Sequence, residues 1–504
     1  MKHPSKSICG LSCLMVAAIL SVLLIYFTDI APASTTDLRI GSKKFTENVI
    51  LANIAGLILE QEGLDVQYQH ELGGTRILWE AMQRGDLAIY PEYTGTLQFE
   101  ILMQPDLDSW EKLQSALLEQ GIGISPPLGF NNTYGVGMRR QHAKKLGIEK
   151  VSDLQRYPDL VYGLGHEFIE RADGWSALKQ RYTLPEVQLR GMDHDIAYRA
   201  IANKSIDVMD VYTTDAEIEA YDLLVLEDDL SHFPRYEAVY VYRSDIEGLV
   251  KPHLEQLAGK ISEQKMIRMN AAAKLGGVAA MQVAANYLED VFHLSIQVTE
   301  VSLFDEILDR SREHIFLVLV SLAAAIVVAV PLGMWAANWQ RSGQFILAIV
   351  GMIQTMPSLA LLVIMIPIFG IGAFPALVAL FFYSLLPIVR GTYLGFSSIS
   401  NEMRETAEVL GLSAISRFHF VYWPLALSSV LSGIKTAAVI NVGTATLGAL
   451  IGAGGFGQTM LRGIRLDDSQ LILAGALPAA CLALLVQWLF DLLERFSVSP
   501  GLKI

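Results

Sequence analysis

The feature that most constrains this chain is a series of long apolar runs after about residue 312. A helix needs about 20 mainly apolar residues to cross a bilayer. Five runs approach or exceed that length, and the third is shorter and marked by prolines; they occupy residues 315–337, 345–369, 374–389, about 428–451 and about 471–493. They predict an all-α membrane domain at about 310–500.

The part of the chain before this domain has the opposite character. Residues 30–311 carry 26 basic and 43 acidic side chains, a net charge near −17, whereas residues 312–504 carry ten bases and eight acids. An acidic field of this size disfavours nucleic acid as a partner. The sequence therefore predicts an acidic soluble part joined to a nearly neutral membrane part.

The chain begins with a further apolar run at residues 8–27, which follows Lys2 and Lys6. The small residues at 31–33 fit a cleavage site, so residues 1–30 can be a removable signal peptide or a retained membrane anchor. Both alternatives export the residues that follow.

Basic residues then set the topology of the later segments. If the soluble part lies outside, six of the ten bases of the membrane part lie inside, as the positive-inside rule favours: Arg341, Arg390, Arg404, Arg417, Arg495 and Lys503. The outer loop with Arg462 and Arg465 is an exception to the rule. We expect a multi-pass protein of the cell (inner) membrane whose residues 37–302 lie on the periplasmic, extracytoplasmic side.

The cytoplasmic loop at about 400–424 contains a short helix pattern. Asn401 is a suitable N-cap, and Gly411 is a suitable residue to close the helix. Pro424 prevents the helix from continuing into the next segment, because proline has no N–H and clashes with the preceding turn.

The run Glu405-Thr406-Ala407, followed by Gly411 and Pro424, resembles the coupling-loop motif of permease subunits of ABC importers. Thr406 departs from the alanine of that motif. The resemblance implies that a separate ABC ATPase subunit docks on the loop, through Glu405, Ala407, Gly411 and Pro424, with Ala407 small enough for close approach. The sequence contains no Gly-x-x-x-x-Gly-Lys-Ser/Thr phosphate loop, so we expect ATP hydrolysis from that other subunit.

Residues 37–302 alternate strand and helix patterns with short glycine turns, which is typical of an α/β domain with mainly parallel strands. One predicted strand ends at Ile89, because Pro91 cannot donate to a ladder. Ligands of such domains bind beyond strand carboxyl ends and at helix N-termini. This topology places Tyr93 at a ligand-binding edge.

Several stretches of this domain resemble the solute-binding proteins of osmoprotectant (glycine betaine, carnitine, choline) ABC importers. They are GSKKFTE (41–47), ELGGT (71–75), AIYPEYTGT (88–96), FNNTYG (130–135), HEFIERADGW (166–175), DVMDVYTTDAEI (207–218) and LEDDLSHFPRY (226–236). The resemblance implies an α/β two-lobed periplasmic-binding-protein domain, type II-like, followed by an all-α transmembrane ABC permease domain.

That family holds a quaternary ammonium group in a cage of tyrosines. The matching motifs place the cage on Tyr93, Tyr134, Tyr212 and Tyr236. A trimethylammonium group has no N–H to donate, so ring faces must compensate for its lost hydration, each by about 0.5–2 kcal/mol. Thr75 is either a donor to the solute or a simple N-cap, and both alternatives stay open.

Other residues near these motifs receive different interpretations. Strand alternation predicts that Tyr90 packs on the side opposite Tyr93. Arg235 departs from the family pattern and must point to solvent if it is not to repel an ammonium group. Three further polar residues are interpreted as lobe-surface or hinge groups and not as ligands: Glu167, Arg171 and Asp173.

Catalysis and metal binding find little support. His194, Asp210 and Asp215 invite such ideas, but no His/Cys cluster has ligand spacing and no Gly-x-Ser-x-Gly elbow occurs. We therefore predict no catalytic residue, no metal and no cofactor. A ligand-gated receptor or channel, and an importer of another small solute such as an amino acid, stay open as alternatives.

The sequence thus predicts a fused substrate-binding and permease subunit of an ATP-driven importer of quaternary ammonium osmoprotectants. A permease of about 200 residues is one half of a pore, so we expect a homodimer with two ATPase subunits. The linker at about 294–313 looks ordered, and tethering replaces a free binding protein by a high local concentration.

Overall fold

The computed structural model describes residues 38–107, 109–298, 302–466 and 468–498, and the predicted N-terminal signal or anchor lies outside them. The described chain forms two compact units. We call them the N-terminal unit, built mainly from residues before 300, and the helical unit, built mainly from residues after 302.

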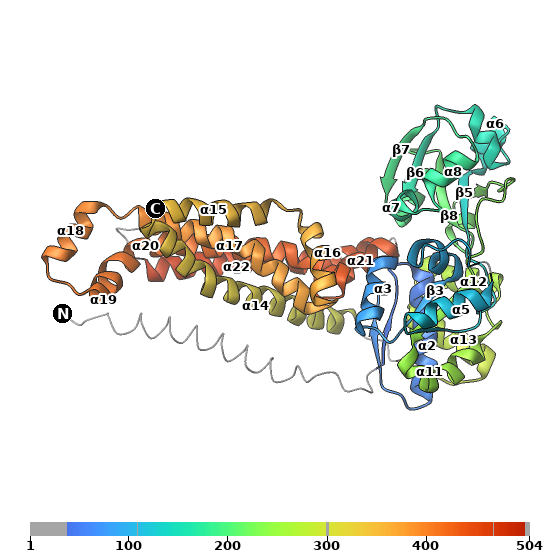
Figure 1. Cartoon of the computed structure of the whole chain (residues 1–504), viewed down its shortest axis with the longest axis horizontal. Coiled ribbons are helices and arrows are strands. Elements are labelled where there is room, and N and C mark those ends of the chain that lie inside the picture. The colour runs from blue at the N-terminus through green and yellow to red at the C-terminus, as the bar shows by residue number, and fades with distance from the viewer. Residues whose placement is uncertain (1–37, 108, 299–301, 467, 499–504) are drawn as a thin grey trace. The chain divides into compact units, whose positions relative to one another are not determined.

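The N-terminal unit has two lobes, each organised around a five-stranded sheet (Figure 1). The first-lobe sheet has the order β2-β1-β3-β10-β4. Its strands are β1 (Leu38–Gly41), β2 (Val66–Gln69), β3 (Ile89–Tyr93), β4 (Ile122–Ile124) and β10 (Ala238–Arg243). β1 pairs in parallel with β2 and β3, whereas β10 runs antiparallel between β3 and β4.

The second-lobe sheet repeats this arrangement in the order β7-β6-β8-β5-β9. Its strands are β5 (Tyr134–Arg139), β6 (Val161–Gly165), β7 (Gln188–Met192), β8 (Val208–Tyr212) and β9 (Leu223–Val225). β5 is the antiparallel strand here, between β8 and β9. The chain crosses between the lobes twice, at residues 125–133 and 226–237, and Asn131 and Glu237 pair where the two crossings meet.

Helices surround both sheets. α2 (Thr46–Gln61) is buried over most of its length and packs against α12 (Glu263–Lys274) and α13 (Ala280–Phe292). The remaining α-helices of this unit are α3 (Thr75–Arg84), α4 (Thr94–Thr96), α5 (Trp110–Glu119), α6 (Arg140–Leu146), α7 (His166–Glu170), α8 (Trp175–Arg181), α9 (His194–Ala202), α10 (Glu217–Ala220) and α11 (Glu247–Leu254). The predicted two-lobed α/β architecture is confirmed.

The prediction that Pro91 ends the third strand is wrong. β3 continues to Tyr93, and Pro91 pairs with Tyr240 of β10. The ladder between β3 and β1 ends at Ile89, so no N–H is required from Pro91 on that side. The carbonyl of Pro91 accepts instead from Asn48 Nδ2 at 2.9 Å.

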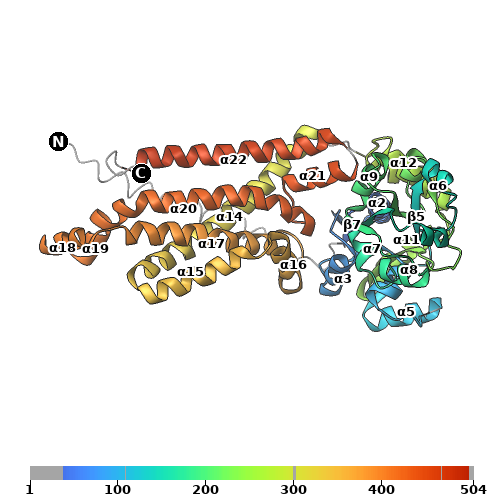
Figure 2. The same cartoon turned by 90° about the horizontal axis from the view of Figure 1, so that it is seen from above.

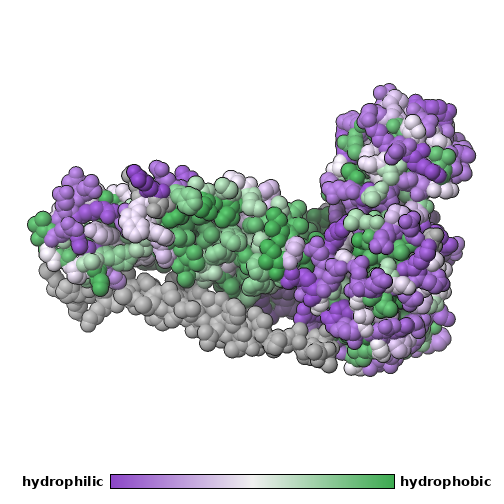
Figure 3. Space-filling model, in the orientation of Figure 1, coloured by the Kyte–Doolittle hydropathy of each residue, from purple (hydrophilic) through white to green (hydrophobic). Residues whose placement is uncertain are grey.

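The helical unit consists of long helices and a loop with two short ones (Figure 2). They are α14 (Leu303–Asn338), α15 (Gln340–Thr355), α16 (Ser358–Phe369), α17 (Ala373–Ser397), α18 (Asn401–Val409), α19 (Ala414–Arg417), α20 (Trp423–Thr444), α21 (Phe456–Arg465) and α22 (Ser469–Ser497). Hydrophobic residues dominate its surface between α16 and the α18–α19 loop (Figure 3).

Four of the described helices are long and apolar enough to cross a membrane. The segment predicted as the second span is a pair, Gly343–Thr355 and Ser358–Phe369, bent by 94°. Pro357 lies at the bend as the N-cap of α16, where it cannot continue the preceding helix. A count of five spans therefore depends on this bent pair.

Glycines allow α17 and α20 to approach closely. A Cβ on Gly391 would lie 2.7 Å from the Ser429 carbonyl oxygen, and one on Gly433 would lie 2.5 Å from the Pro387 carbonyl oxygen. Both distances are too short for a real side chain. Small residues at such crossings let membrane helices associate through backbone contact.

We predict that Gly433→Val destabilises the helical unit, because the new side chain forces α17 and α20 apart. Overpacking of this kind costs about 1–3 kcal/mol, which should lower the thermal midpoint and broaden the size-exclusion profile of the detergent-purified chain. Gly443→Val is the matched control, since a Cβ on Gly443 of the same helix meets nothing within 4 Å. Equal stability of the two variants would contradict the packing argument.

Candidate ligand-binding site

Three of the four predicted cage tyrosines meet directly. Tyr134 opens β5 and pairs across the sheet with Tyr212 at the end of β8, and their ring centroids are 5.0 Å apart. Tyr236 lies on the second crossing segment, and its ring centroid is 5.6 Å from that of Tyr134. The edge-to-face angles of 62° and 76° leave these rings facing different directions, as the walls of a cage must.

Tyr93 joins the group through an aromatic residue that we had not singled out. The ring of Phe45 lies 6.1 Å from Tyr93 and 5.7 Å from Tyr212, measured between centroids. Burial raises the pKa of the Tyr93 phenol well above its ordinary value, so the hydroxyl stays protonated. It donates to Glu47 Oε1 at 2.7 Å. The four predicted cage tyrosines thus come from both lobes and one of the crossings between them, and their contact with a solute stays a prediction.

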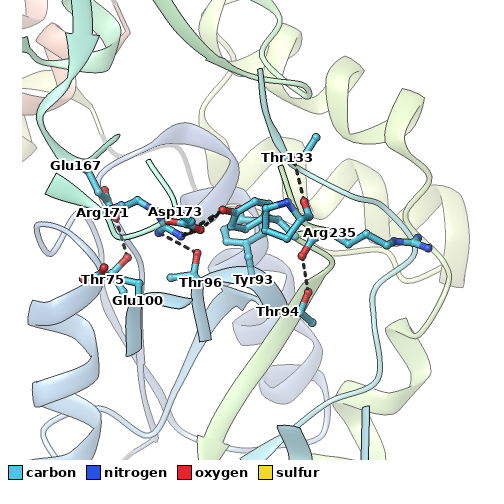
Figure 4. Close-up of polar contacts among 12 residues, drawn as sticks. Thr75, Tyr93, Thr94, Thr96, Glu100, Thr133, Glu167, Arg171, Asp173 and Arg235 are labelled. Atoms are coloured by element: carbon cyan, nitrogen blue, oxygen red, sulfur yellow. Dashed lines mark hydrogen bonds and ion pairs between the residues drawn. The ribbon is translucent and has the colours of Figure 1, made fainter. Parts of the chain in front are cut away.

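Arg171 is buried against two of the predicted cage tyrosines, so the lobe-surface alternative for it is wrong. Only 4% of Arg171 is exposed, and its Cζ is 5.4 Å from the ring centroid of Tyr134 and 5.6 Å from that of Tyr236. Asp173 receives two hydrogen bonds of 2.8 Å from the guanidinium, and Thr96 accepts a third at 3.4 Å (Figure 4). Tyr236 also donates its hydroxyl to Asp173.

Thr75 belongs to a polar chain beside Tyr93. The N-cap of α3 is Gly74, so the simple N-cap alternative for Thr75 is wrong. Its hydroxyl accepts from Lys43 Nζ at 2.9 Å and donates to Glu167 Oε1 of the second lobe, also at 2.9 Å. Lys43 further pairs with Glu92 at 2.6 Å and lies 5.6 Å from the Tyr93 ring centroid.

Two other expectations agree with the structure. Tyr90 is fully buried in β3, on the face opposite Tyr93 by strand alternation. The side chain of Arg235 is 78% exposed, pairs with Glu237 at 2.9 Å, and extends away from Arg171 and Asp173 in Figure 4. Arg235 therefore does not place its charge in the cage.

His194, Asp210 and Asp215 lie close together, next to the ring of Tyr212. The imidazole lies 4.2 Å from the Tyr212 ring, 2.9 Å from Asp215 Oδ2 and 3.4 Å from Asp210 Oδ2. Asp215 also accepts from the Tyr198 hydroxyl at 2.6 Å and from the Tyr212 N–H at 2.9 Å. Asp215 thus bonds to donors of the chain itself, and its bond from the Tyr212 N–H helps to hold Tyr212 in place.

The loop expected to meet an ATPase carries α18 and α19. Its helix begins at Asn401 with Ser400, not Asn401, as N-cap, and Gly411 adopts a φ of 70° just beyond its end. Ala407, expected to let another protein approach, is buried, with only 2% exposed. The exposed residues of the loop include Glu405 and three large apolar side chains, which are Val409, Leu410 and Ile415. Pro424 lies in the first turn of α20, inside one helical segment that runs from Ala414 to Ile451, so the expectation that it stops the helix is wrong.

Two lobes that share an aromatic cage, followed by a bundle of apolar helices with an exposed loop, define a solute-binding domain joined to a membrane transport domain. Residues 36–290 match the family described as the substrate binding domain of ABC-type glycine betaine transport systems. Residues 329–497 match the binding-protein-dependent transport system inner membrane component family. The chain belongs to both families, and it combines their two parts in one polypeptide, as the sequence predicted.

Two curated relatives are permease proteins. The glycine betaine/carnitine/choline transport system permease protein OpuCB of Bacillus subtilis is 35% identical over 198 residues, 39% of this chain and 91% of the relative. The osmoprotectant import permease protein OsmW of Salmonella typhimurium is 37% identical over 196 residues, 38% of this chain and 91% of the relative.

Among solved structures, a crystal structure of a glycine betaine/carnitine/choline ABC transporter is similar to this chain. The match covers 50% of this chain and 98% of the other, with 28% identity and a TM-score of 0.44.

Proposed function

We propose that the chain captures a zwitterionic quaternary ammonium solute, such as glycine betaine or carnitine, and imports it through its own permease domain. The observation that carries this proposal is the buried guanidinium of Arg171 against Tyr134 and Tyr236. The guanidinium is paired with Asp173, but it still presents N–H donors beside the rings, where a second cation finds no acceptor. A carboxylate on the solute accepts from Arg171 while the ammonium occupies the ring faces.

The donors available to a carboxylate support the same solute class. Arg171 and Thr96 already lie within hydrogen-bond distance of each other, and they come from opposite lobes. An arginine–carboxylate hydrogen bond contributes about 1.5–3 kcal/mol. Choline has no carboxylate that could accept from Arg171, so Asp173 would stay the only ionic partner of the guanidinium among the described residues, beside the solute's cation.

The same contacts argue against an amino acid, the alternative left open by the sequence. An amino acid's ammonium group carries N–H donors that need acceptors once they are buried. The carboxylates beside the cage already accept from the protein: Asp173 from Arg171 and Tyr236, and Glu47 from Tyr93. Ring faces suit a methylated nitrogen, which has no such requirement.

Transport further requires partners and a defined orientation. The N-terminal unit lies on the extracytoplasmic side, and the loop with α18 and α19 lies in the cytoplasm. A separate ABC ATPase subunit docks on the exposed apolar residues of that loop, and two permease domains pair around the translocation path. An ATP-driven importer needs a surface on which the ATPase docks, whereas a ligand-gated receptor or channel does not. The exposed loop therefore favours the importer over that alternative.

The first test is solute binding by the full-length chain in detergent, measured by equilibrium dialysis with radiolabelled glycine betaine. We expect binding in the micromolar range, with dimethylglycine weaker and glycine weakest, because each lost methyl adds an N–H to bury. Tyr134→Ala should weaken glycine betaine binding at least tenfold. Arg235→Ala is the control and should bind like the wild type. If neither glycine betaine nor carnitine binds, the proposed solute class is wrong.

The second test addresses the charge on the solute. Arg171→Ala should lower glycine betaine affinity about 10- to 100-fold, the equivalent of one lost charge-assisted hydrogen bond. Choline affinity should rise or stay constant in the same variant, because the repelling cation is gone and Asp173 has lost its partner. Competition dialysis with both solutes measures this change. A parallel loss of both affinities would mean that Arg171 only maintains the fold.

The third test addresses the ATPase partner. Leu410→Asp places a charge on a side chain that is 70% exposed, so it should leave the chain folded while it removes co-purification of the ATPase subunit and transport into vesicles. Leu118→Asp, on a leucine of the N-terminal unit that is 55% exposed, is the matched control and should keep both. The wild-type chain purified alone should hydrolyse no ATP. Normal ATPase association of Leu410→Asp would rule out this docking surface.

A further inference from the structure

Glu47 is a buried carboxylate that accepts four hydrogen bonds behind the cage. Only 3% of the residue is exposed. Oε1 accepts from the Tyr93 hydroxyl and from Asn132 Nδ2, each at 2.7 Å. Oε2 accepts from the Thr214 hydroxyl at 2.6 Å and from Asn270 Nδ2 at 3.1 Å. All four partners are satisfied when the carboxylate is ionised, the form that only accepts.

The other charges near Tyr93 are paired with one another. Lys43 pairs with Glu92 at 2.6 Å, and Arg171 pairs with Asp173 at 2.8 Å. Within the described residues, Glu47 has hydrogen bonds but no ion pair. Its position in the first turn of α2 supplies some stabilisation from the helix N-terminus. Burial nevertheless raises the pKa of Glu47, and the bonds from Thr214 and Tyr93 oppose that shift.

A buried carboxylate without a cation is costly, because it has lost its hydration without gaining an opposite charge. Here it is bonded to the phenol of a ring that faces the cage. A cation placed on that ring interacts with the negative charge through a medium of low polarity, where electrostatic interactions are strong. Within the described residues, no cation fills this role for Glu47.

We propose that Glu47 is the counter-charge of the solute's ammonium group: it fixes the Tyr93 phenol and makes the cage select a cation over an uncharged group of the same shape. This inference rests on the proposed function, and it adds a positioning residue that lies behind the ring. Glu47 does not touch the solute itself.

The test compares two probes on the full-length chain. Glycine betaine and 3,3-dimethylbutanoate have the same shape, but the second has a neutral carbon in place of the charged nitrogen. The measured quantity is the dissociation constant of 3,3-dimethylbutanoate divided by that of glycine betaine, and both are obtained by competition dialysis. Glu47→Gln should reduce this ratio at least tenfold, because betaine binds more weakly while the uncharged isostere does not.

Two further variants separate charge from structure. Tyr93→Phe keeps the ring but removes its bond to Glu47, so the ratio should fall, by less than in Glu47→Gln. Thr214→Val removes a hydrogen bond to the same carboxylate from the other lobe and leaves the charge, so both affinities should change together and the ratio should hold. If Glu47→Gln does not fold, the Tyr93→Phe ratio decides.

The outcomes distinguish this inference from the proposed function. A wild-type chain that does not bind glycine betaine overturns both. A wild-type chain that binds it, together with an unchanged ratio in Glu47→Gln, overturns the role of Glu47 alone. Equal losses for both probes also overturn it, since Glu47 would then only hold the lobes together.

Discussion

The stacking of a buried cation on aromatic faces organises the N-terminal unit. Arg171 could not be buried without compensation, because a desolvated charge costs several kcal/mol. Asp173 and the rings of Tyr134 and Tyr236 supply that compensation. These groups come from the second lobe and from a crossing segment, and the guanidinium also reaches Thr96 of the first lobe. The same contact therefore holds the lobes in their present relation, and in the proposed function it also meets the solute's carboxylate.

Bridges between the lobes surround that contact. Thr75 donates to Glu167, and Lys44 pairs with Asp193 at 2.5 Å. The second pair is partly exposed and contributes little, about 0–1 kcal/mol. The bridge through Thr75 is better shielded from water and depends on Lys43 being in place. In the proposed function, a solute adds its own bonds to bridges that the chain already makes between the lobes.

Local motifs made the lobes and the tyrosines predictable, because strand-end aromatic residues and glycine turns are visible in short stretches of sequence. The charged residues of the site were not predictable in this way. Arg171 is the C-cap of a five-residue helix, and nothing in the local sequence distinguishes it from a surface residue. The rings of Tyr134 and Tyr236 lie against it only in the folded domain. Glu47 looks like an ordinary acidic residue in a first helical turn. The strand through Pro91 and the bend at Pro357 depend on which neighbour pairs with the backbone, and that is a property of the tertiary structure.

The placement of charge is what the proposed preference for a zwitterion depends on. Two positive groups, Arg171 and Lys43, lie against the rings, and the carboxylate of Glu47, which has no ion pair within the described residues, accepts from the Tyr93 hydroxyl. A zwitterion satisfies both ends, whereas a simple cation or anion satisfies only one. Ten residues separate the end of α13 at Phe292 from the start of α14 at Leu303, a reach of at most about 36 Å. In the proposed function, so short a connection takes the place of the diffusional search that a free binding protein must make, because it sets a high effective concentration of one unit for the other.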